Sequence, residues 1–153
     1  KKDAIRRNIQ IRVLGDKSGL SSELQSLIQD VEKATRGMDS FHLQFAINYG
    51  GRDELCRAMR RIAVEGHKPE EITQEMVSEH LDTAGIPDPD LLIRTSGEQR
   101  ISNFLLWQLA YSEFYFSDKY WPDFTSEDLE EAILDYAGRQ RRFGGRKQEG
   151  ASC

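Results

Sequence analysis

The chain has 153 residues, of which 38% are hydrophobic and 31% charged, with 12 glycines and 4 prolines. This composition is that of an ordinary soluble globular protein and excludes collagen-like, coiled-coil and low-complexity chains, while the length predicts one compact domain. The 21 basic and 26 acidic residues give a net charge of −5. A generally basic surface is therefore excluded, and we expect no nucleic-acid partner.

Alternating apolar residues predict a first strand at residues 9–13, ending in the turn Gly15-Asp16. Helical spacing of apolar residues follows, with Ser22 and Gln25 as a predicted capping box and Gly37 as the stop. This first half of the pattern predicts a strand followed by an amphipathic helix.

The same order then repeats along the chain. A second alternating run at 41–47 is broken by glycines before helical spacing resumes up to Ile62. A short helix around Met76 precedes the apolar run 91–93, which is typical of a central parallel strand, and Thr125 or Ser126 caps a last helix. We therefore predict an α/β fold with a parallel sheet flanked by helices and with ligands at the carboxyl ends of its strands.

The densest polar cluster lies at such a carboxyl end. Arg94, Arg100 and Ser102 surround a small Ser-Gly turn directly after the run 91–93. Two guanidinium groups that converge around a flexible turn suit the oxygens of a phosphate. The alternative is that both arginines only pair with Glu98 at the surface, and spacing alone favours neither reading.

A second strand-to-helix junction carries Asn48-Tyr49-Gly50-Gly51-Arg52. Its glycines permit a tight turn and would leave backbone amides free to meet a phosphate. The more frequent role of such a segment is an ordinary turn that Arg52 braces, and Asn48 fits either role.

Glu113 stands in an aromatic, strand-like run at 111–116, where an unpaired buried carboxylate would be costly. Mg²⁺, an arginine or an exposed position on the strand would each satisfy it. The histidines have no ligand spacing and are predicted to lie on the surface or on helices. The aromatic group is most simply core or subunit interface, with a lipid-lined groove as the alternative; its members are Phe104, Trp107, Tyr111, Phe114, Tyr115, Phe116 and Trp121.

The sequence predicts a cytoplasmic location for the protein. No apolar stretch approaches the roughly 18 residues that cross a bilayer, and the first residues carry no signal-peptide core. Cys56 and Cys153 have neither disulfide nor zinc-site spacing, and Cys56 is predicted to be a small core residue.

Five positive charges fall between residues 139 and 147, a run that is more often a solvated tail than a binding element, and we predict a flexible tail at 144–153.

Three segments together resemble the cis-prenyltransferase family, and within it the bacterial undecaprenyl diphosphate synthases. They are Asn48-Tyr49-Gly50-Gly51-Arg52, the run from Leu92 to Trp107 that reads LIRTSGEQRISNFLLW, and Trp121-Pro122-Asp123-Phe124. The similarity runs in order from about Ile9 to Gly145. It implies condensation of isopentenyl diphosphate with farnesyl diphosphate, with Mg²⁺, to a long Z-polyprenyl diphosphate.

The resemblance also implies roles for residues. Arg94, Arg100 and Ser102 match the positions that hold isopentenyl diphosphate, and Glu113 matches the acidic position of the Mg²⁺ and diphosphate network. Asn48 and Arg52 match a motif beside the active-site floor. Arg142 and Gly144 match an Arg-x-Gly element that reaches towards the diphosphates, commonly across a dimer interface. The family implies a homodimer, two diphosphate substrates, and transient peripheral contact with a membrane on product release.

Two family segments do not occur in the sequence: a phosphate loop resembling Asp-Gly-Asn-Gly-Arg and a segment resembling Phe-Ser-x-Glu-Asn. We therefore expect residues 1–153 to be the C-terminal part of the family domain and to be inactive when isolated. The alternative is a non-catalytic partner subunit of a two-component prenyltransferase. An unrelated phosphate-binding α/β domain is a third reading, which the length of the middle motif disfavours.

Overall fold

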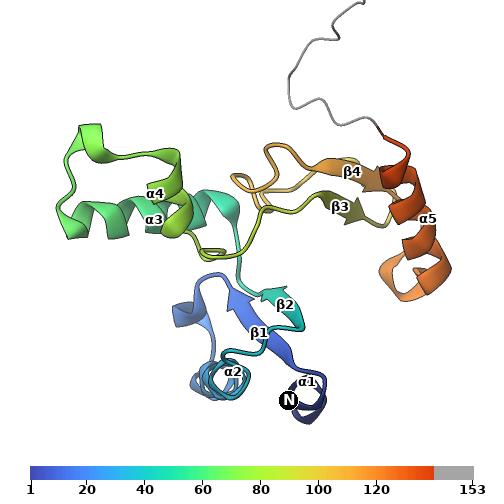
Figure 1. Cartoon of the computed structure of the whole chain (residues 1–153), viewed down its shortest axis with the longest axis horizontal. Coiled ribbons are helices and arrows are strands. Elements are labelled where there is room, and N and C mark those ends of the chain that lie inside the picture. The colour runs from blue at the N-terminus through green and yellow to red at the C-terminus, as the bar shows by residue number, and fades with distance from the viewer. Residues whose placement is uncertain (140–153) are drawn as a thin grey trace, which may run out of the picture. The chain divides into compact units, whose positions relative to one another are not determined.

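The computed structural model describes residues 1–139. Two compact units make up this part of the chain: an N-terminal unit (residues 1–87 with 103–107) and a C-terminal unit (residues 88–102 with 108–139). Figure 1 labels the helices α1 (Lys2–Arg6), α2 (Ser22–Ala34), α3 (Gly51–Glu65), α4 (Gln74–Glu79) and α5 (Ser126–Ala137), and the strands β1 (Ile9–Leu14), β2 (Phe41–Ala46), β3 (Leu91–Arg94) and β4 (Glu113–Phe116). Short 3-10 turns lie at Lys17–Gly19, Pro69–Glu71 and Trp121–Asp123.

The strands of the N-terminal unit pair in parallel. Ile9 lies opposite Phe41, and the register continues to Leu14 opposite Ala46. Helix α2 connects the two strands and contacts β1, as expected of a parallel crossover. The buried apolar residues of this unit are Ala4, Val13, Leu14, Ile28, Ala58, Ile62 and Leu81.

Side chains close the outer edge of β1. In a parallel pair alternate residues face away from the partner strand. The outward amides of Ile11 and Val13 donate to Thr35 Oγ1 at 3.1 Å and to Glu32 Oε1 at 2.8 Å. Just beyond the strand, the Gly15 amide donates to Asp82 Oδ2 at 2.9 Å. Because these three backbone amides are already hydrogen-bonded to side chains, they cannot pair with a further strand, and the outer edge of β1 is protected against strand addition.

The C-terminal unit repeats the parallel arrangement with shorter strands. Leu91 lies opposite Glu113, and the register ends with Arg94 opposite Phe116. Helix α5 contacts β4. Thr125 caps α5 through a reciprocal capping box with Asp128. Parallel strands alternating with helices confirm the predicted α/β fold class.

The structure corrects several details of the sequence predictions. The N-cap of α2 is Ser21, which accepts the Leu24 amide, and not Ser22. Cys56 is exposed on α3 and is not a core residue. Tyr111, Phe116 and Trp121 are exposed within their unit, so the core interpretation is wrong for them.

Three further predictions concern a membrane span, the number of domains and the C-terminal tail. Among the described residues, no helix is both long and apolar enough to span a bilayer. One domain over residues 1–153 stays a prediction. The predicted tail at 144–153 lies outside residues 1–139.

Candidate active site

The turn after β2 carries the first group of predicted site residues. Asn48 adopts a φ of 49°, in the left-handed region that asparagine tolerates better than most residues. Its side chain donates to the Asp16 carbonyl at 2.8 Å, while the Asp16 amide donates to the Asn48 carbonyl at 3.1 Å. Asn48 thereby joins the loops that follow β1 and β2.

Asn103 holds the start of α3. The Gly51 amide donates to the Asn103 carbonyl at 2.7 Å, and the Arg52 amide donates to Asn103 Oδ1 at 3.0 Å. A Cβ at Gly51 would lie 2.8 Å from Leu106 Cγ and 3.0 Å from the Leu106 nitrogen, so this position requires glycine. The less favoured interpretation, in which the amides of this turn are free for a phosphate, is wrong for Gly51 and Arg52, as the favoured ordinary turn requires.

The turn borders a cavity, and next to it lies the exposed guanidinium of Arg52. A cavity of about 370 Å³ is lined by Asp16, Asn48, Tyr49, Gly50 and Asp53. The exposed guanidinium of Arg52 has no partner among residues 1–139. Asn48 therefore lines a cavity, and the side chain of Arg52 is exposed.

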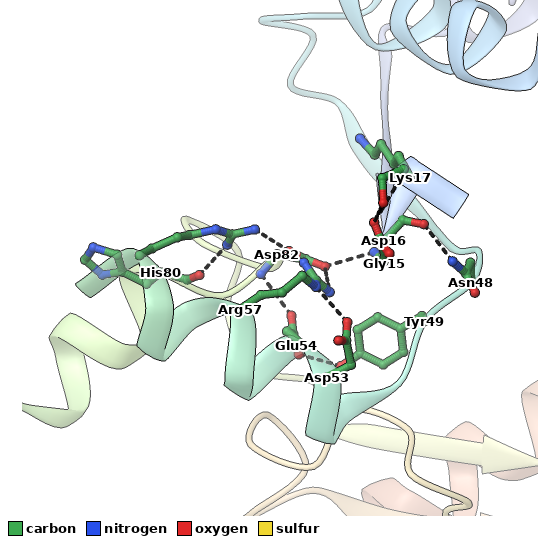
Figure 2. A network of polar contacts seen from close by, with 12 residues as sticks. Gly15, Asp16, Lys17, Asn48, Tyr49, Asp53, Glu54, Arg57, His80 and Asp82 are labelled. Carbon is green, nitrogen blue, oxygen red and sulfur yellow. Dashed lines mark hydrogen bonds and ion pairs between the residues drawn. The ribbon is translucent and has the colours of Figure 1, made fainter. Parts of the chain in front are cut away.

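Below this turn lies a network of polar contacts, shown in Figure 2. Arg57 of α3 makes a two-point ion pair with Asp82, with distances of 2.7 Å and 2.8 Å. Glu54, almost completely buried, accepts the Tyr49 hydroxyl at 2.5 Å and the Asp82 amide at 2.9 Å. Each of the two carboxylates is thus held by at least two donors.

This network shifts several acid–base equilibria. Burial alone would raise the pKa of Asp82, but hydrogen bonds from Arg57 and the Gly15 amide outweigh burial and hold that pKa below its ordinary value. Burial, followed by the hydrogen bond to Glu54, raises the pKa of the Tyr49 hydroxyl far above its usual range. Tyr49 is therefore a neutral donor at physiological pH, and Asp82 is ionised.

The second group of site residues lies in the C-terminal unit. Arg94, at the end of β3, donates from Nη1 to the Arg100 carbonyl and to Ser102 Oγ, the latter at 3.1 Å. Arg100 pairs with Glu98. One loop therefore gathers the three residues predicted to bind the diphosphate. The surface pairing with Glu98 holds for Arg100, whereas Arg94 instead crosses the loop.

This loop has unusual backbone geometry. Ser96 and Ser102 have positive φ angles of 73° and 47°, in the left-handed region that non-glycine residues seldom adopt. The Ser96 amide donates to the Lys119 carbonyl at 2.7 Å, and the Gly97 amide donates to the Ser117 carbonyl at 2.9 Å. Such backbone strain persists when the surroundings fix it, and it clusters at binding sites.

Glu113, the first residue of β4, pairs with an arginine. Arg139 Nη1 lies 2.9 Å from Glu113 Oε2, and the same guanidinium contacts Asp135. These two partners, Glu113 first, raise the pKa of Arg139. Of the partners considered from sequence, the structure shows an arginine.

Glu113 is the residue that the family resemblance expects to contribute to a magnesium site. Within residues 1–139, no group of three or more His, Cys, Asp or Glu side chains could hold a metal ion. Mg²⁺ commonly uses one or two carboxylates and completes its shell with waters and substrate phosphates. Glu113 fits that pattern as a single carboxylate ligand that would exchange Arg139 for the cation.

The histidines were predicted to lie on the surface or on helices, which is confirmed for His42, an exposed residue, and for His80, the C-cap of α4, while His67 is half-buried in the turn after α3. His67 Nε2 and His80 Nε2 lie 3.1 Å and 3.0 Å from the same oxygen of Glu65. His42 lies on β2 rather than on a helix, and it is exposed. Within residues 1–139, none of the three histidines has a hydrogen bond or ion pair with a predicted site residue.

Sequence reasoning missed the polar framework of the site. Asn103 lies inside the quoted middle motif, and its position next to Ser102 could have drawn attention to it. Asp82 and Glu54 gave no signal, because their partners are up to 67 residues away along the chain. Arg142 and Gly144 lie outside the described residues.

Comparison with known proteins gives a consistent result. A family model described as "Putative undecaprenyl diphosphate synthase" matches residues 1–144. An isoprenyl transferase of Rhizobium meliloti is 55% identical over 150 residues, which are 95% of this chain and 61% of the relative. A ditrans,polycis-undecaprenyl-diphosphate synthase of Pseudomonas putida, (2E,6E)-farnesyl-diphosphate specific, is 52% identical over 141 residues, 90% of this chain and 56% of the relative.

A solved structure is similar as well. The crystal structure of lavandulyl diphosphate synthase from Lavandula x intermedia, in complex with dimethylallyl diphosphate, matches with a TM-score of 0.86 at 39% identity. The match covers 94% of this chain and 67% of that one. The chain spans about three fifths of the length of the curated relatives it matches.

Proposed function

Because the chain belongs to the cis-prenyltransferase family, we propose that it provides the isopentenyl-diphosphate-binding part of an enzyme that elongates cis-prenyl chains. The reaction condenses isopentenyl diphosphate with farnesyl diphosphate and yields a long Z-polyprenyl diphosphate. The observation that carries the proposal is the loop after β3, where Arg94 reaches both Ser102 and the backbone of Arg100.

In this proposal the loop binds the diphosphate group of isopentenyl diphosphate. Arg94 spends Nη1 on the loop itself, so Nε and Nη2 remain for phosphate oxygens. Arg100 turns from Glu98 to the ligand, and the Ser102 hydroxyl donates a third hydrogen bond. Two guanidinium groups offset most of the charge of a diphosphate and fix its orientation.

Glu113 is the proposed carboxylate ligand for Mg²⁺. When bound, the cation supplies charge neutralisation for a departing diphosphate. When Glu113 leaves its ion pair with Arg139, the Arg139 guanidinium becomes available as a further donor for diphosphate oxygens. Asn48 and Arg52 support the turn, and Arg142 and Gly144 are proposed to reach the diphosphates across a homodimer interface, with transient membrane contact when product leaves.

A non-catalytic partner subunit is the second candidate. The observation that favours it is that Arg100 and Glu113 are already paired with protein groups. A partner subunit has no need for a diphosphate site, and the two candidates therefore differ in ligand binding.

Isothermal titration calorimetry tests the proposal. Titration of the chain with isopentenyl diphosphate should give a saturable isotherm with one site, while isopentenol, which lacks the diphosphate, should give none. Absence of binding at millimolar isopentenyl diphosphate, from a chain whose circular dichroism shows a folded protein, would favour the partner subunit.

A further inference from the structure

Asp82, in the segment after α4, accepts four hydrogen bonds with its two carboxylate oxygens. Its side chain is 10% exposed, and both of its oxygens accept a guanidinium N–H of Arg57. Oδ2 also accepts the Gly15 amide at 2.9 Å, and Oδ1 accepts Arg61 Nη2 at 3.3 Å. Through these charge-assisted hydrogen bonds, the Asp82 carboxylate holds the loop after β1 and helix α3 in place.

The contacts of Asp82 belong to a closed ring, which Figure 2 shows. From the Asp82 carboxylate the ring passes through the Gly15 amide to Asp16, which exchanges two hydrogen bonds with Asn48. The neighbouring Tyr49 donates to Glu54, and Glu54 in turn accepts the Asp82 amide. Each segment of the ring is therefore fixed from two sides.

One ring member, Asn48, has a strained backbone, and another, Gly15, occupies a position that only glycine fits. Gly15 has a φ of 113°, and a Cβ there would lie 2.2 Å from the Ile47 carbonyl oxygen. Asn48 has a φ of 49°. Backbone in sparsely populated regions persists only where surrounding contacts over-determine it. The ring supplies these contacts on both sides of the Asp16–Asn48 junction.

We propose that Asp82 and Arg57 are positioning residues that lock the Asn48 turn through Gly15 and Asp16. Arg57 keeps the Asp82 carboxylate ionised and oriented, and the carboxylate anchors the Gly15 amide. The hydrogen bonds that connect Arg57 to the Asn48 turn pass through the Asp82 carboxylate, the Gly15 amide and Asp16. The proposal deepens the proposed function, since Asn48 is one of its supporting residues, but the contacts that carry it are independent of any substrate.

Asp82→Asn and Arg57→Lys are the informative variants. Asp82→Asn preserves size but replaces one acceptor oxygen by an NH₂ group, which faces the donors of Arg57 or Gly15. Arg57→Lys keeps the charge and loses the two-point geometry. Asp53→Asn is the matched control: Asp53 accepts Arg57 Nε at 2.7 Å, but it is 54% exposed and lies outside the ring.

Amide hydrogen exchange of the ¹⁵N-labelled chain measures the effect residue by residue. In Asp82→Asn we expect exchange at Gly15 and Asp16 to accelerate roughly tenfold or more, the usual consequence of losing a hydrogen bond to a charged group. The side-chain amide signal of Asn48 should shift, while the Ile62 amide in α3 changes much less. Arg57→Lys should give a smaller effect of the same pattern, and Asp53→Asn none.

A merely stabilising ion pair gives a different pattern, in which Ile62 and Gly15 accelerate together and the Asn48 signal of the folded state stays in place. That result, or unchanged exchange at Gly15 and Asp16, would overturn the proposal. If Asp82→Asn does not fold, Arg57→Lys decides between the same two patterns. If the unmodified chain does not bind isopentenyl diphosphate at all, the proposed function fails, while the exchange result on the ring still stands.

Discussion

Removal of the Arg94 guanidinium is the most informative perturbation of the proposed diphosphate site. Arg94 already uses Nη1 for the Arg100 carbonyl and Ser102 Oγ, which leaves Nε and Nη2 for a ligand. A hydrogen bond to a charged group contributes about 1.5–3 kcal/mol, and each 1.4 kcal/mol is about tenfold in affinity. Arg94→Ala should therefore raise the Kd for isopentenyl diphosphate about 10- to 150-fold.

Arg94→Lys separates charge from geometry. Lysine keeps the positive charge but cannot both cross the loop and present two parallel donors to a phosphate, so it should recover only part of the lost affinity. Arg60→Ala is the control, because Arg60 is an exposed arginine of α3 in the other unit and its loss changes the net charge by the same amount.

Calorimetric Kd values and melting temperatures are measured together for the three variants. If Arg94 only braces the loop, Arg94→Ala lowers the melting temperature while the Kd stays within about twofold of the unmodified chain, a range too small for a lost charge-assisted bond. Full recovery of affinity by lysine would equally refute the two-donor geometry. The first result would remove Arg94 from the proposed site, and the second would leave it there as a positive charge without a two-donor contact.

Two further predictions concern stability. His80 donates from both ring nitrogens, to the Met76 carbonyl at 2.6 Å and to Glu65 at 3.0 Å, and these bonds raise its pKa. The stability that it contributes is full below the unfolded pKa of about 6.5 and is lost as pH rises through the higher folded value, so the hydrogen-exchange protection factors of α4 amides should fall as pH rises above about 6.5, but not in His80→Gln. Protection factors of α4 that do not change with pH would contradict the doubly donating histidine. Thr35→Val leaves the Ile11 amide without its acceptor at a fully buried position and should cost about 1–3 kcal/mol in urea unfolding, whereas Thr35→Ser, which keeps the hydroxyl, should cost less; equal losses would show that the hydroxyl contributes nothing.

Local sequence patterns predicted the elements because each depends on neighbours within a few residues. The alternation at residues 9–13 and 41–47 matches β1 and β2 to within a residue, since a half-buried strand requires that period. The cap of α2 was misplaced by one residue because two adjacent serines, Ser21 and Ser22, fit the same rule. Strand β4 begins at Glu113, two residues after the aromatic run starts, because periodicity does not fix where pairing begins.

Long-range polar contacts were beyond sequence reasoning. Asp82 contacts Gly15, which lies 67 residues away, and Arg52 donates its amide to Asn103, which lies 51 residues away. Single residues of these types occur throughout the chain, and only the fold selects the pairs. The loop from Arg94 to Ser102 was predictable because all of its members lie within nine residues of one another.

The central claim is that the loop after β3 binds the diphosphate of isopentenyl diphosphate through Arg94 and Arg100. The most direct measurement is a ¹H–¹⁵N spectrum of arginine side chains, recorded during a titration of the labelled chain with isopentenyl diphosphate. The guanidinium signals of Arg94 and Arg100 should shift and saturate together, and the signal of Arg57, which is held by Asp82, should stay in place. Saturable shifts at other arginines with Arg94 and Arg100 unmoved would contradict the account.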